Sequence, residues 1–176
     1  LLITSKNKPV LEMSIPREHG RYSKWRQMKV KISSINAGVS GEYFVAAELS
    51  KRGFIASITL RNTKGIDILA TNPETEKTLN VQVKTHQGKS RSWILNKKAE
   101  NNYASNLFYV FVSLKGLMDR PDYYIAPSKT VATYVKNSHA EWLRTLEKNG
   151  QQRNDSSMRK FEDKSGEYLE RWDLLK

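Results

Sequence analysis

The stretch LNVQVKTHQG, residues 79–88, decides how this chain is expected to fold. Apolar and polar side chains alternate along it in the order Leu79, Asn80, Val81, Gln82, Val83 and Lys84. Alternate side chains of a strand point to opposite faces, so the stretch predicts a strand with one apolar and one polar face. The polar face, which carries Gln82 and Lys84, either meets water or faces a substrate.

The neighbouring stretches predict further strands. IDILAT (66–71) is joined to the first stretch by the polar turn NPETEK (72–77), which predicts an antiparallel hairpin. LFYVFVSL (107–114) is a continuous apolar run, typical of a strand buried on both faces. FIASITL (54–60) and DYYIA (122–126) are also expected to be strands.

A helix is predicted for residues 33–52, where apolar side chains recur at helical spacing, serines stand at the start and Gly53 follows the end. Gly38 and Gly41 lie three apart inside it, although glycine disfavours a helix by about 1 kcal/mol relative to alanine. The pair indicates either close approach of another backbone or a break before Gly41.

The order of helix, three strands, polar segment, two strands and helix predicts an α/β fold of three layers, with a mixed central sheet flanked by helices. A long helix over residues 128–148 and a short one around GEYLERWDLL (166–175) predict that residues 127–176 form a C-terminal helical part. We expect one domain over 28–176. Residues 1–27 are expected to be an N-terminal extension, either poorly ordered or from upstream of the true start.

The net charge of +12 and the pI near 9.8 predict a polyanionic partner, which is most often nucleic acid. The chain has no cysteine, which excludes disulfides, thiolate zinc sites and a cysteine nucleophile, and fits a cytoplasmic protein. The longest apolar runs are too short to span a bilayer, so no membrane partner is expected.

A carboxylate inside an apolar strand, as at Asp67, requires compensation by a cation or a metal ion. Together with a helical glutamate and the Gln-X-Lys strand, it forms a pattern that resembles the PD-(D/E)XK nuclease superfamily over residues 34–126. The residues that carry the resemblance are Glu42, Asp67, Gln82, Val83 and Lys84. Ile66 stands where the family often has proline, and Gln82 replaces the usual acidic residue, as in Mrr-like restriction nucleases.

The resemblance implies a restriction-endonuclease-like fold and an endonuclease that hydrolyses DNA phosphodiesters with Mg²⁺ or Mn²⁺. Asp67 is expected to be the principal metal ligand, with the carbonyl oxygens of Gln82 and Val83 and the carboxylate of Glu42 as further ligands. Lys84 is expected to orient the attacking water or to stabilise the developing charge.

Four cations follow the predicted site and are expected to contact the phosphates of double-stranded DNA, namely Lys89, Arg91, Lys97 and Lys98. Trp93, between them, is expected to pack in the core. A single site cuts one strand, so cleavage of both strands favours a homodimer.

Other interpretations stay open. Taken singly, Lys84 is most simply a solvated strand lysine, and Glu42 an ordinary helix glutamate. Gln82 can also mark a catalytically lapsed nucleic-acid-binding module on the same fold. An RNA-directed nuclease shares every one of these residues.

Overall fold

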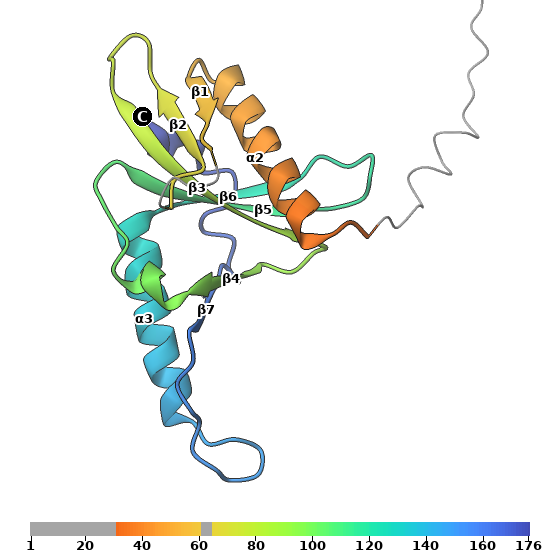
Figure 1. Cartoon of the computed structure of the whole chain (residues 1–176), viewed down its shortest axis with the longest axis vertical. Coiled ribbons are helices and arrows are strands. Elements are labelled where there is room, and N and C mark those ends of the chain that lie inside the picture. Colours follow the sequence, from red (N-terminus) through yellow and green to blue (C-terminus); the bar gives the residue numbers. More distant parts are fainter. Residues whose placement is uncertain (1–30, 61–64) are drawn as a thin grey trace, which may run out of the picture.

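A five-stranded mixed sheet forms the centre of the computed structural model, which describes residues 31–60 and 65–176 (Figure 1). The predicted extension, residues 1–27, lies outside the described residues. β3 and β5 pair in parallel, whereas the other neighbouring strands are antiparallel. In sheet order the strands are β1 (Ile55–Ile58), β2 (Ile68–Thr71), β3 (Thr78–Gln87), β5 (Leu107–Leu114) and β6 (Asp122–Pro127).

Two helices cover opposite faces of this sheet, α2 (Ser34–Lys51) on one and α3 (Ser128–Arg144) on the other (Figure 1). Alternate residues of β5 therefore enter two different cores, with Val110 on the α2 side and Phe111 on the α3 side. The predicted three-layer α/β fold with a mixed sheet is confirmed, as are the antiparallel hairpin of β2 and β3 and the burial of β5 on both faces.

A second, two-stranded sheet lies beside α3 and was not predicted. It consists of β4 (Ser92–Asn96) and β7 (Met158–Glu162), which pair in antiparallel fashion. The 3-10 helix η1 (Lys97–Glu100) directly follows β4. Trp93 of β4 is buried, as predicted, and its indole N–H donates to the Val112 carbonyl at 3.1 Å.

Residues 127–176 are less helical than predicted. α3 ends at Arg144, and β7 and the 3-10 helix η2 (Trp172–Leu175) follow. The predicted helix around GEYLERWDLL is wrong, because the Tyr168 carbonyl accepts from the Ile125 N–H and the Glu170 N–H donates to the Tyr123 carbonyl. These bonds form an isolated bridge between Leu169 and Tyr124 of β6, with turns on either side of it, so the backbone groups are satisfied without a helix before η2.

No helix among the described residues is long and apolar enough to cross a membrane.

The close approach that the two glycines indicated occurs at one of them. α2 runs unbroken through both, with the Ser33 hydroxyl accepting from the Asn36 N–H at its start. A Cβ added at Gly41 would lie 1.9 Å from Thr85 Oγ1 and 3.0 Å from Thr85 Cβ, whereas no described atom lies within 4 Å of one added at Gly38. Gly41 therefore lets α2 pack directly on β3.

Replacing Gly41 by alanine is expected to destabilise the protein by about 1–3 kcal/mol, because Thr85 is short and β-branched and cannot yield without moving β3. Gly38→Ala is the matched control and should stabilise by up to about 1 kcal/mol through helix propensity. Urea unfolding of both variants measures the difference. Equal effects would contradict the packing of α2 against Thr85.

Candidate active site

The polar face of β3 lines a cleft. Val81 and Val83 are buried against α2, so Gln82 and Lys84 point to the opposite face, where both are half-buried. The cleft has a volume of about 610 Å³. It is lined by Gly65, Gln82, Lys84, Leu95, Asn96, Lys98, Ala99, Asn101, Asn102 and Tyr109. Gln82 and Lys84 thus face a hollow with polar walls.

The far wall of the cleft comes from η1 and the loop that follows it. Asn96 caps η1 by accepting from the Lys98 N–H at 3.0 Å. The loop is tied to the start of α3, because the buried Ser128 hydroxyl donates to the Ala104 carbonyl and accepts from the Ala104 N–H. These bonds hold Lys98, Asn101 and Asn102 opposite β3.

Asp67 lies at the edge of β3, directly before β2. Its N–H donates to the Val81 carbonyl at 2.9 Å, and its Oδ2 accepts from the Val83 N–H at 2.7 Å. The N–H and C=O of one strand residue point to the same side, so the Val83 carbonyl lies on the edge that faces Asp67. The partner that compensates the carboxylate is a backbone amide, and no described ion pair includes Lys84.

Gln82 carries a buried acceptor without a donor. Its Oε1 has no hydrogen-bond partner among the described residues. Gly65 stands beside it, because a Cβ added there would meet Asn102 Nδ2 at 3.2 Å and Gln82 Oε1 at 3.9 Å. Gly65 also has a φ of 67°, a conformation that favours glycine. A buried acceptor without a partner is costly, so this oxygen is suited to a cation or a bound water.

Tyr109 lines the cleft, and the charge of Asp67 affects the pKa of its hydroxyl. Burial raises the pKa of the Tyr109 hydroxyl, a hydrogen bond with Asn102 lowers it, and the Asp67 carboxylate raises it again. The phenol is 1% exposed. Asn102 and Asp67 therefore act in opposite directions on the pKa of the Tyr109 hydroxyl.

Glu42 lies on α2, which packs on the face of the sheet opposite the cleft. It is half-buried on α2, one residue after Gly41, and α2 packs on the face that carries Val81 and Val83. Its approach to Asp67 around the sheet edge stays a prediction.

The four predicted cations separate into different roles. Lys98 lines the cleft, and Lys89 is exposed in the loop after β3. Lys97 instead forms an ion pair with Asp155 at 2.9 Å. Arg91 donates to the Lys164 carbonyl at 3.1 Å and so supports the C-terminal segment. Lys98 is thus the predicted cation that the structure places in the cleft itself.

Sequence reasoning missed the amides and the phenol of the cleft. Asn101 and Asn102 lie in a polar loop without periodicity, and Tyr109 lies inside an apolar run that indicated only a buried strand. The tyrosine hydroxyl in that run was the one available signal, because a buried phenol requires a polar partner.

Comparison with known proteins gives a structural likeness but no sequence match. No protein-family model matches the sequence, and a search of curated proteins finds no match. A search of solved structures finds a bacterial homing endonuclease, I-Ssp6803I, with 17% sequence identity and a TM-score of 0.48. The alignment covers 82% of this chain and 93% of that one.

Proposed function

We propose that this protein is a divalent-metal-dependent endonuclease that hydrolyses phosphodiester bonds in DNA. The observation that carries the proposal is the arrangement of three groups on or beside β3. The Asp67 carboxylate accepts from the Val83 N–H, Gln82 places in the cleft a buried oxygen that has no donor among the described residues, and Lys84 lines the same cleft. The net charge of +12 supports a polyanionic substrate.

The oxygen donors at this edge fit Mg²⁺ or Mn²⁺. Asp67, the Gln82 amide oxygen and the Val83 carbonyl are hard ligands, which these ions prefer. No group of three or more His, Cys, Asp or Glu that could hold a metal occurs in the described part of the chain, so the ion would be held by this mixed set. Once bound, the ion would activate water and act as a Lewis acid on the phosphate.

Side chains of the protein would stabilise the developing charge and hold the substrate. Lys84 lines the cleft, forms no ion pair with another described residue, and would stabilise negative charge that develops on the phosphate oxygens. Lys98 and the amides of Asn101 and Asn102 would hold the substrate from the opposite wall. Glu42 would complete the ligand set from α2, as the resemblance implies.

The direct test is cleavage by the full chain of supercoiled plasmid, linear duplex, single-stranded DNA and RNA. Each is incubated with Mg²⁺, with Mn²⁺ and with EDTA. Metal-dependent cutting of DNA supports the proposal, and exclusive cutting of RNA would replace DNA as the substrate. Absence of cutting with any substrate and either metal would contradict the proposed nuclease.

A second candidate is a nucleic-acid-binding module on the same fold, favoured by one observation. An amide, Gln82, stands where the related nucleases usually have a carboxylate. If this interpretation is correct, the full chain binds DNA in a salt-sensitive manner but cuts none of the four substrates.

Replacing Gln82 by glutamate is expected to lower the Mg²⁺ concentration for half-maximal activity by on the order of tenfold, because affinity in such sites depends on the number of charged ligands. A titration of cleavage rate against Mg²⁺ measures this. Asn96→Asp, on the opposite wall of the cleft, is the matched control. An equal change in both variants would indicate a general charge effect, not a ligand at residue 82.

A further inference from the structure

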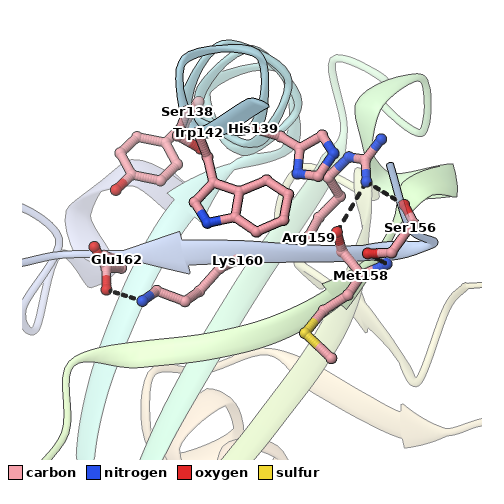
Figure 2. A pocket seen from close by; sticks show the side chains of 9 residues that line it. Ser138, His139, Trp142, Ser156, Met158, Arg159, Lys160 and Glu162 are labelled. Atoms are coloured by element: carbon pink, nitrogen blue, oxygen red, sulfur yellow. Dashed lines mark hydrogen bonds and ion pairs between the residues drawn. The ribbon is translucent and has the colours of Figure 1, made fainter. Parts of the chain in front are cut away.

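A second hollow lies between α3 and β7, on the other side of η1 from the cleft. It has a volume of about 310 Å³. One wall comes from α3 and consists of Tyr134, Ser138, His139 and Trp142. The other wall comes from β7, with Met158, Arg159, Lys160 and Glu162, and from Ser156 just before it. Figure 2 shows the Trp142 ring projecting from α3 over β7. None of these residues belongs to the candidate active site.

Part of the wall of this pocket is aromatic, and two of its residues are exposed to solvent. Trp142 is 40% exposed and Met158 is 57% exposed. The Trp142 ring is nevertheless held in place, because His139 stacks on it at 5.3 Å and the Arg153 guanidinium lies 4.7 Å from its centroid. A large ring that is fixed but exposed is suited to stack on a planar ligand.

Polar groups stand at the rim. Lys160 and Glu162 form an ion pair at 2.6 Å, and Ser138 and Ser156 add hydroxyls (Figure 2). Apolar walls with a few polar groups are typical of small-ligand sites, and 310 Å³ is near the lower limit of their volumes. A single nucleobase fits such a pocket, because it has two flat faces that can stack and a polar edge that can form hydrogen bonds.

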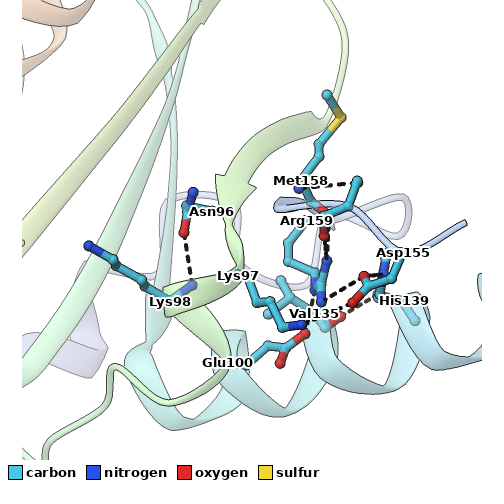
Figure 3. Close-up of polar contacts among 11 residues, drawn as sticks. Asn96, Lys97, Lys98, Glu100, Val135, His139, Asp155, Met158 and Arg159 are labelled. Atoms are coloured by element: carbon cyan, nitrogen blue, oxygen red, sulfur yellow. Dashed lines mark hydrogen bonds and ion pairs between the residues drawn. The ribbon is translucent and has the colours of Figure 1, made fainter.

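A network of ion pairs between side chains connects the pocket to η1, which forms part of the cleft wall. Asp155 accepts from Lys97 at 2.9 Å and from His139 at 2.8 Å, and the buried Arg159 pairs with Glu100 (Figure 3). Lys97 and Glu100 are the ends of η1, which also carries Lys98 of the cleft. Lys98 of the cleft and Lys97 of the ion-pair network are therefore adjacent residues of η1.

We propose that the pocket between α3 and β7 binds one unpaired nucleobase, so that the preferred partner of this protein is nucleic acid with an unpaired or extruded base near the cut. The inference rests on the proposed function for its partner class. The base stacks on the part of the Trp142 ring that His139 and Arg153 leave exposed, and its edge meets Ser138 and the Lys160–Glu162 pair.

The experiment measures binding by the full chain in EDTA, so that cleavage does not enter. The fluorescent probes are a paired duplex, the same duplex with one unpaired 2-aminopurine, and a single strand containing 2-aminopurine. The wild type is expected to bind the unpaired probes more tightly and to quench 2-aminopurine. Trp142→Ala should weaken binding of these probes by about tenfold and abolish quenching, with the paired duplex unchanged. Trp142→Phe should keep most of both effects.

Leu146→Ala is the matched control, because Leu146 follows the end of α3 closely, is 62% exposed and does not line the pocket. Circular dichroism confirms that each variant is folded. Equal binding of paired and unpaired probes, or quenching that survives in a folded Trp142→Ala, overturns the nucleobase pocket alone. If none of the three probes is bound, the proposed nucleic-acid function fails as well.

Discussion

Replacing Asp67 by asparagine is expected to reduce metal-dependent DNA cleavage by about 1,000-fold or more. The metal supplies several kilocalories of transition-state stabilisation, and each ~1.4 kcal/mol is a factor of ten in rate. Asparagine keeps an oxygen that can accept from the Val83 N–H, so the sheet edge is preserved while the negative charge is lost. Single-turnover cleavage at saturating Mg²⁺ measures the effect.

Asp119→Asn is the matched control, since Asp119 is exposed and lies in the loop between β5 and β6. Lys84→Met provides an independent test at the same site and should lower the rate by about 100-fold, as removal of one charge-stabilising group does. Both variants should still bind DNA. Cleavage at the wild-type rate by Asp67→Asn would show that the ion, if any, is held elsewhere.

Replacing Arg159 by methionine is expected to destabilise the protein by about 3–5 kcal/mol, because it leaves a half-buried Glu100 without its cation. The Arg159 side chain is 2% exposed and pairs with Glu100, and its guanidinium also donates to the carbonyls of Ser156 at 2.6 Å and Met158 at 2.8 Å. The melting temperature should fall by roughly 6–20 °C. Thermal and urea unfolding measure the change.

Two comparisons sharpen this prediction. The double variant Glu100→Leu with Arg159→Met removes both charges and should recover part of the lost stability. Arg171→Met breaks an ion pair with Asp173 that is exposed on both sides, and should leave the melting temperature nearly unchanged. If Arg159→Met behaves like Arg171→Met, the Arg159–Glu100 pair does not hold β7 against η1.

The strands with regular patterns were predictable from the sequence. The alternation that ends at Lys84 identifies β3 and separates its two faces, and the apolar run at 107–114 identifies β5. The register of β2 on β3 follows from the short turn between them. The same local pattern placed Asp67 next to the Gln-X-Lys strand, because a hairpin brings its two strands together whatever the rest of the chain does.

β7 shows why other elements escaped prediction. Its buried positions are Arg159 and Phe161, and an arginine at a core position does not indicate an apolar face. Arg159 is tolerated there because Glu100, distant in sequence, and Asp155 supply opposite charge and two backbone carbonyls accept from its guanidinium. The ion pair of Lys97 with Asp155 was not predicted either, because the two residues are far apart in sequence.

The sequence by itself determined the central hairpin, the strand buried on both faces, the helix that requires Gly41 and the place of Asp67 beside the Gln-X-Lys strand. All of these depend on periodicity or on neighbours within one hairpin. Only the tertiary structure decided the far wall of the cleft, the partners of Lys97 and Arg159, and the pocket around Trp142. These depend on polar side chains brought together across long stretches of chain, and such side chains leave no periodic pattern because their position is determined by their partners.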